Sequence, residues 1–196
     1  AGQIDAKADL RRAILKVDDA YWTKPAGDAA RATVRASFEP NRPTQIDATL
    51  DAGQNDVQGR LTLNDGRFAT ARIDRLRLPL VEGTGTVERL ADDSWHLQFS
   101  GPRVNMTQFL DDVMGGPPGP KTGPVIAATL SFDHAVLAEK VEVNNLRTTA
   151  RVAKGDLRQL EVRSDIAPKG ALRIDITPDG KHRKMAMDST DAGLVL

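Results

Sequence analysis

The chain has 196 residues, 27 Lys and Arg against 27 Asp and Glu, no Cys, 40% hydrophobic residues and 4% aromatic residues. This composition is typical of a globular chain with one domain or two small ones. A formal net charge of zero argues against the basic surface with which proteins bind nucleic acid. Without Cys the chain has no disulfide, no thiolate nucleophile and no zinc–thiolate or iron–sulfur site.

The sequence also carries no sign of a membrane helix or a signal peptide. No stretch approaches the roughly 18 consecutive apolar residues that a membrane-spanning helix needs. The first residues, Ala1 to Asp5, include no basic region followed by an apolar one. The last three, Leu194 to Leu196, form an apolar end without a cap. We therefore expect this chain to be a fragment of a longer protein.

Short segments that alternate apolar and polar residues recur along most of the chain. Residues two apart share one face of a strand, so each segment predicts a half-buried strand. The segments are 32–38, 46–50, 57–63, 95–99, 126–132, 146–152 and 172–176. Hairpin turns are indicated at 64–66 and 178–180, and more weakly at 144–145 and 155–156. The predicted fold class is all-β, as an antiparallel meander.

One short amphipathic helix is predicted near residues 105–114. Asn105 can cap it and Gln108 follows three residues later. Its apolar side is predicted to consist of Phe109, Leu110, Val113 and Met114. Residues 115–124 are rich in Gly and Pro and predict a linker. The expected organisation is a β-rich half over 1–114, the linker, and a β-rich half over 125–196 that continues the same sheet. Phe132 is the only aromatic residue of this second half, whose apolar face therefore relies on its neighbours.

The residues that could carry catalysis are few and scattered. His96, His134 and His182 lie in different segments and lack the spacing of metal ligands. Ser94 and His96 share a strand face, but a catalytic triad also needs a third group to orient the base. Gly83 to Thr86 lacks the Lys and the following helix of a phosphate loop. We expect no enzymatic activity, no cofactor and no metal site.

Several motifs, taken in order along the chain, resemble one protein family. Ala8–Leu10 precedes Trp22–Gly27, which has the form Trp-x-Lys-Pro-x-Gly. Gly101–Leu110, Val141–Leu146 and Asp188–Gly193 follow. In order and spacing these motifs resemble the AsmA-like family of Gram-negative envelope proteins, in particular the large YhdP type of bridge-like lipid transport protein. The resemblance covers nearly the whole chain.

The resemblance implies a long antiparallel sheet curled into a groove with an apolar concave side. It implies a non-enzymatic role in phospholipid transport or lipid homeostasis between the inner and outer membranes. The parent protein would be periplasmic and anchored in the inner membrane, and its partners would be phospholipid acyl chains and envelope proteins. Membrane contact would then be made only by segments of the parent that this chain lacks.

An apolar sheet face can line an open groove or form the core of a closed sandwich. A face rich in Ala, Val, Leu and Ile but poor in aromatic residues has few large groups to fill a closed core, which is compatible with the groove. The residues alone still favour the sandwich, and it is the resemblance that shifts the preference to the groove. The side chains predicted to face lipid are Ile126, Leu130, Phe132, Leu146, Ala150, Val152, Leu172, Ile174 and Ile176, whereas Arg147, Arg151, Arg173 and Asp175 are predicted to face water.

Two other functions remain open at this point. The first is a scaffolding β-domain that binds a periplasmic envelope protein through a sheet edge. The second, and least favoured, is a hydrolase acting on envelope lipids or glycans, which needs a polar cleft with converging acid and base groups.

Overall fold

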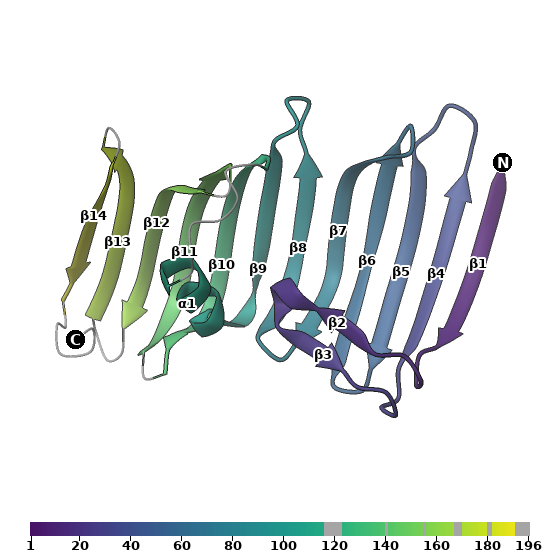
Figure 1. Cartoon of the computed structure of the whole chain (residues 1–196), viewed down its shortest axis with the longest axis horizontal. Helices are drawn as coiled ribbons and strands as arrows, with labels where there is room; N and C mark the ends of the chain where they lie inside the picture. Colours follow the sequence, from purple (N-terminus) through teal and green to yellow (C-terminus); the bar gives the residue numbers. More distant parts are fainter. Residues whose placement is uncertain (116–122, 140, 155, 167–169, 180–181, 191–196) are drawn as a thin grey trace. The chain divides into compact units, whose positions relative to one another are not determined.

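The structure, a computed structural model, describes residues 1–115, 123–139, 141–154, 156–166, 170–179 and 182–190. The described chain is mostly β-strand, with one long sheet, a second sheet of two strands and one short α-helix (Figure 1). The long sheet is mainly antiparallel and is not closed into a barrel, which confirms the all-β class. The chain divides into two compact units, Ala1–Arg89 and Leu90–Leu196.

The first unit contains six strands of the long sheet. Each pairs antiparallel with the next in the order β1 (Gly2–Asp9), β4 (Arg31–Phe38), β5 (Thr44–Ala52), β6 (Asn55–Asn64), β7 (Arg67–Leu78) and β8 (Val81–Arg89). The predicted turn at 64–66 joins β6 to β7. Asp65 and Gly66 have φ values of 50° and 74° there, in the left-handed region that tight hairpin turns require.

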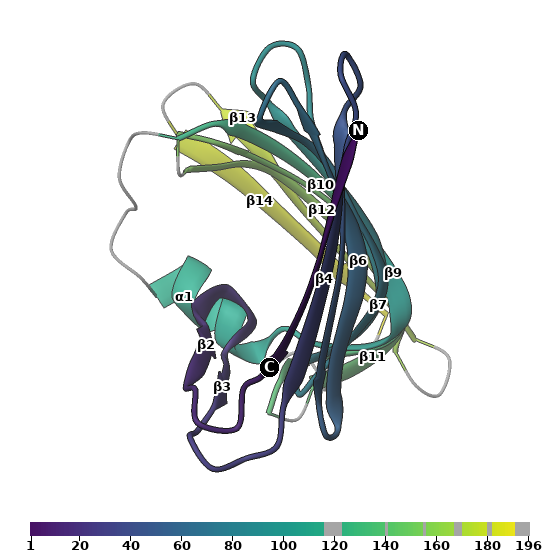
Figure 2. The ribbon, with the colours of Figure 1, turned by 90° about the vertical axis from the view of Figure 1, so that its right-hand side faces the viewer.

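A small hairpin interrupts the sheet between β1 and β4. It consists of β2 (Leu15–Val17), the 3-10 turn η1 (Asp18–Ala20) and β3 (Trp22–Lys24). The two ends of the segment that contains this hairpin are joined by a hydrogen bond, which Leu10 N donates to Ala30 O at 2.9 Å. In Figure 2 the hairpin stands off one face of this unit's strands. The sequence pattern missed it because three-residue strands are too short to show alternation.

The second unit contributes the other six strands of the long sheet. They are β9 (Trp95–Asn105), β10 (Val125–Ala138), β11 (Val141–Ala153), β12 (Asp156–Ile166), β13 (Gly170–Asp179) and β14 (His182–Ser189). Strands β10 to β14 pair antiparallel in that order, whereas β9 and β10 are parallel. This pair departs from the predicted meander. A parallel neighbour must begin at the same end of the sheet, so it needs a crossover connection rather than a tight turn.

The crossover contains the predicted helix, α1 (Thr107–Gly115). The helix begins two residues later than predicted, and the Asn105 side chain accepts a hydrogen bond from Thr107 N at 3.0 Å. Phe109 is exposed, contrary to the predicted apolar side, while Leu110 is half-buried. Of the predicted linker 115–124, residues 116–122 lie outside the described residues. Strand β9 pairs with β10 and belongs to the second compact unit. The two units therefore divide between residues 89 and 90, before β9, and not at the linker.

The weak turn signal at Asn144–Asn145 was wrong, because both residues lie inside β11. Asn145 has a φ of 53°, and the register between β11 and β12 shifts by one residue at this point. The left-handed residue therefore marks a β-bulge. Phe132 and Leu146 are buried on one side of the bulge, and Ala135 and Val143 are buried on the other. The buried positions thus change from even to odd numbers along β10 and β11.

Candidate functional site

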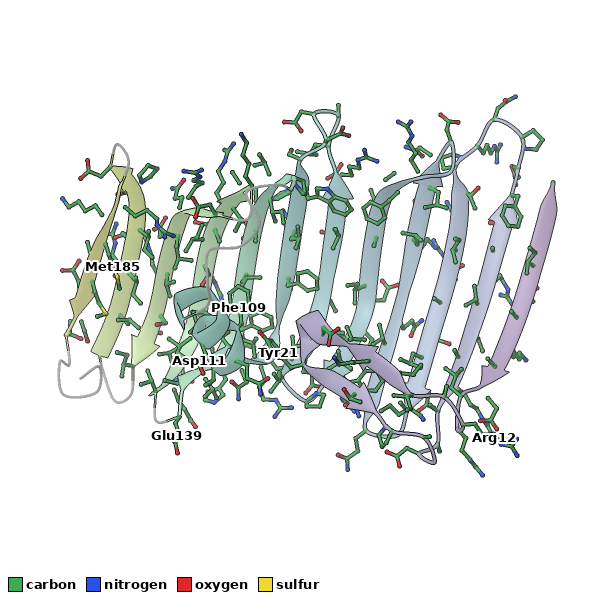
Figure 3. All side chains as sticks on the ribbon, in the orientation of Figure 1. Arg12, Tyr21, Phe109, Asp111, Glu139 and Met185 are labelled. Atoms are coloured by element: carbon green, nitrogen blue, oxygen red, sulfur yellow. The ribbon has the colours of Figure 1, made fainter. Side chains whose placement is uncertain are left out.

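One face of the second unit's sheet is apolar across all six strands. The strand register aligns its side chains in rows that run perpendicular to the strands. One row consists of Leu97, Ala128, Ala150, Leu160, Ile176 and Met185. The next consists of Phe99, Leu130, Thr148, Val162, Ile174 and Met187. We call this side of β9–β14 the second apolar face. Met185, which is labelled on β14 in Figure 3, is half-exposed at its margin.

All nine residues predicted to face lipid lie on the second apolar face. Ile126 is paired with Val152, Phe132 with Leu146, and Ile174 and Ile176 stand two apart on β13. Phe132, Leu146, Leu172 and Ile176 are buried, and the other five are half-buried. The sequence therefore predicted their common face, while lipid contact stays a prediction.

The four charged residues predicted to face water lie on the opposite face of these strands. Arg147, Arg151 and Arg173 are exposed. Asp175 is half-buried and forms an ion pair with Arg173 at 2.7 Å. The hydrogen bond with Asp175 raises the pKa of Arg173 above its ordinary value. Three arginines occupy one row on this side, since Arg147 lies opposite Arg163 and Arg163 lies opposite Arg173.

Burial on the second apolar face is greatest near α1. The helix packs on β10, and in Figure 2 it stands on the hollow side of this unit's bowed strands. Phe132, Ala135, Val143 and Leu146 are all almost inaccessible to solvent. Sequence reasoning missed Ala135 and Val143, because the bulge takes them out of the period of two on which that prediction depended.

Two buried polar side chains also lie on the second apolar face. Thr148 is on β11 and Ser164 is on β12. Within the described residues, neither hydroxyl oxygen has a hydrogen-bond partner. Nothing in their sequence context singles them out, because Ser and Thr are common in strands.

The first unit has an apolar face of the same construction but with smaller side chains. One row consists of Ile4, Ala36, Ile46, Leu61, Ala71 and Val87, and the next of Ala6, Val34, Ala48, Gly59, Ile73 and Gly85. We call this side of β1 and β4–β8 the first apolar face. Among the residues of these two rows only Ala36 is buried, and Ile4 is 56% exposed. The first apolar face is therefore largely open.

The β2–β3 hairpin is fixed by a buried lysine. Lys24 is 3% exposed, and its Nζ donates hydrogen bonds to Ala13 O at 2.9 Å and to Pro25 O at 2.7 Å. An ammonium group that leaves water must find such partners. Trp22, two residues earlier, is 5% exposed. The Trp-x-Lys-Pro-x-Gly motif therefore has a structural role in this chain, in holding the hairpin together.

The polar side of the first unit carries charges of alternating sign. Asp5, Arg35, Asp47 and Arg60 lie opposite one another on four neighbouring strands. Arg35 pairs with Asp5 at 2.6 Å and Arg60 pairs with Asp47 at 2.7 Å. The hydrogen bond from Arg35 lowers the pKa of Asp5 below its ordinary value. Opposite charges facing each other across strands favour this register over a slipped one.

The residues considered for catalysis do not gather into a polar site in the described structure. The Ser94 hydroxyl donates a hydrogen bond to Asp92 at 2.5 Å, which lowers the pKa of that carboxyl. His134 lies 3.3 Å from the Asn144 oxygen, and the side chain of His182 lies outside the described residues. The described residues hold no cluster of His, Asp and Glu able to bind a metal ion. Nor do they include a helix long and apolar enough to cross a membrane.

Comparisons with family models, with characterised proteins and with solved structures found no match to this chain. The two apolar faces consist of aliphatic side chains with few polar atoms, so their main capacity is to remove other apolar surface from water.

Proposed function

We propose that this chain contributes an apolar β-surface that holds the acyl chains of phospholipids. The observation that carries the proposal is that each unit has an apolar face across six strands, and that most side chains in the rows of these two faces are exposed or half-buried. Soluble proteins rarely expose contiguous apolar patches larger than a few hundred Å², and larger patches mark binding surfaces. An acyl chain on such a face gains about 0.8 kcal/mol for each buried methylene group.

The composition of the faces supports acyl chains rather than head groups as the bound part. The rows of both units contain aliphatic side chains, glycine, Phe99 and Thr148, and no charged residue. A surface of this kind recognises hydrocarbon and does not discriminate between charged groups. The charges instead lie on the opposite side of each sheet, where they can remain in water.

The resemblance to AsmA-like proteins supports a wider setting for this surface. In that setting the chain is a non-enzymatic part of a periplasmic protein anchored in the inner membrane. The parent protein serves phospholipid transport or lipid homeostasis between the inner and outer membranes, and segments outside this chain make the membrane contacts. Each apolar face would then contribute to a lipid-conducting β-groove of the parent protein.

Mass spectrometry of solvent-extracted purified protein tests this proposal. We expect phospholipid in the extract of the wild-type protein. Leu130→Lys should remove most of it, because an unpaired ion on an apolar surface costs several kcal/mol. Thr129→Lys is the matched control, since Thr129 is the exposed neighbour on the opposite side of β10. An extract without phospholipid, or equal lipid in both variants, contradicts the proposal.

A scaffolding role is the alternative, and the edge strands favour it. Strands β1 and β14 stand at the two ends of the long sheet, and every side chain of β1 is exposed. An edge strand has unpaired backbone groups that can add a strand from another protein. This alternative predicts that a photo-crosslinker at Gln3 captures an envelope protein and that the purified chain carries no phospholipid.

A further inference from the structure

The second apolar face contains two buried hydroxyl groups that are not satisfied within the described chain. Thr148 is 5% exposed and Ser164 is 6% exposed, and neither oxygen has a hydrogen-bond partner among the described residues. A buried hydroxyl without a partner lowers stability, whereas an aliphatic side chain of the same shape carries no such cost. Packing alone would therefore favour Val and Ala at these positions.

The two hydroxyls are neighbours on adjacent strands. Thr148 lies directly opposite Val162, and Ser164 is two residues further along β12 on the same face. Side chains in this diagonal relation are within reach of a single bound molecule. Their other neighbours across the strands are Leu130 and Leu172. The result is a pair of polar groups inside an aliphatic surrounding.

A water molecule is a poor partner for this pair. Buried waters typically make about three hydrogen bonds to polar groups of the protein. Within the rows described around the site, the neighbours Leu130, Val162 and Leu172 offer no polar side-chain atom. A better partner brings its own hydrocarbon to contact these side chains and one or two oxygens to meet the hydroxyls.

We propose that Thr148 and Ser164 form a polar subsite that donates hydrogen bonds to the ester carbonyl oxygens of an acyl ligand on the second apolar face. This inference rests on the proposed function. A hydroxyl supplies one donor, and an ester carbonyl is an acceptor without charge. Leu130 lies opposite Thr148 and Ile174 lies opposite Val162, and both side chains are half-buried rather than fully covered. The subsite would determine the position of the ligand's ester groups along the second apolar face.

Two probes that differ in the ester group test the inference. Methyl oleate carries an ester carbonyl, and cis-9-octadecene carries none. Each is titrated against the whole chain loaded with the fluorescent apolar dye N-phenyl-1-naphthylamine. We expect Thr148→Val and Ser164→Ala each to reduce the affinity for methyl oleate, relative to octadecene, by up to about tenfold. The affinity for octadecene should change by less than about twofold, since these substitutions leave the apolar surface in place.

Matched controls lie on the opposite side of β10 and β11. Thr149→Val on β11 and Ser131→Ala on β10 make the same chemical changes away from the second apolar face. These variants should keep the wild-type ratio of the two affinities. An unchanged ratio in both Thr148→Val and Ser164→Ala overturns the inference.

The melting temperature of the ligand-free protein gives a second readout. Thr148→Val should melt no lower than the wild type, because it removes an unsatisfied group without removing volume. A clearly lower melting temperature means that the hydroxyl is bonded within the chain, which overturns the inference. If neither probe displaces the dye from the wild-type protein, the proposed function itself fails, and the subsite falls with it.

Discussion

The two units use the same construction to different effect. Each presents an apolar face across six neighbouring strands, yet the first is largely open and the second has a buried region beside α1. The side chains account for the difference. The first face has Ala or Gly at many row positions, whereas the second has Leu, Ile, Val and Phe. The alternation of apolar and polar residues therefore determines that a face is apolar, and the size of its side chains determines how much of that face is buried.

The polar sides differ as well. In the first unit, charges of opposite sign face each other across β1, β4, β5 and β6. In the second unit, arginines face each other across β11, β12 and β13. Cross-strand pairs of opposite charge stabilise a sheet and like charges destabilise it. The contrast is confined to these rows, since Arg60 and Arg72 face each other in the first unit, and in the second unit Arg163 and Arg173 form ion pairs with Glu161 and Asp175.

The largest expected effect comes from removing a buried side chain of the second unit. Leu146 is completely buried, so Leu146→Ala should lower the free energy of unfolding by about 3–4 kcal/mol. Leu61 on the first apolar face is half-buried, and Leu61→Ala should cost only about 1–2 kcal/mol. Chemical denaturation of the two variants measures both values. Equal losses would mean that the two faces are equally closed.

The hairpin of the first unit should depend strongly on one lysine. Lys24→Met keeps the length of the side chain but removes the hydrogen bonds to Ala13 O and Pro25 O. The free energy of unfolding should fall by about 2 kcal/mol, because two carbonyl oxygens lose a charged donor. Hydrogen exchange should show faster exchange in β2 and β3. Lys16→Met, which breaks only the exposed pair with Asp18, is the control and should leave exchange unchanged.

A close backbone contact explains one of the small residues on the first apolar face. A Cβ atom at Gly59 would clash with the backbone oxygen of Arg72, so Gly59→Ala should lower the free energy of unfolding by about 1–3 kcal/mol. A Cβ atom at Gly2 meets only Phe38 Cδ2 at 3.9 Å, and Gly2→Ala should be neutral. Thermal melts of the two variants make the comparison. A stable Gly59→Ala variant would show that the strands at this bulge can separate freely.

The smallest expected effect concerns the polar sides and has opposite signs in the two units. Arg147→Glu turns the Arg147–Arg163 pair into one of opposite charge and should raise stability by about 0.2–1 kcal/mol. Arg35→Glu removes the ion pair with Asp5 and places a carboxylate between Asp5 and Asp47, so it should lower stability by a similar amount. Both shifts should shrink at high salt. Shifts of the same sign would refute the contrast between the polar sides.

Much of the second apolar face could be predicted from the sequence. The alternation in 126–132, 146–152 and 172–176 placed nine apolar residues on one face, because a strand has a fixed period of two. The rest depended on features that alternation does not encode. It carries no strand direction, so the parallel pair of β9 and β10 was missed. It breaks at the bulge of Asn145, so the burial of Ala135 and Val143 was missed as well.

The β2–β3 hairpin and the two buried hydroxyls could not be predicted from the sequence, for other reasons. The strands β2 and β3 contain three residues each, too few to show a period. The burial of Lys24 could not be predicted, because it depends on a hydrogen bond to Ala13 O, which is eleven residues away in the sequence. Thr148 and Ser164 become notable only because the structure buries them without a partner among its described residues.

Photo-crosslinking in cells tests the central claim most directly, namely that the apolar side of the sheet meets lipid. A photoreactive residue is placed at Leu130 or Ile174 on the second apolar face, and at Arg147 or Arg173 on the opposite side. The account predicts lipid adducts at Leu130 and Ile174 and none at Arg147 and Arg173. Equal adducts on both sides, or no lipid adduct at any of the four positions, would contradict it.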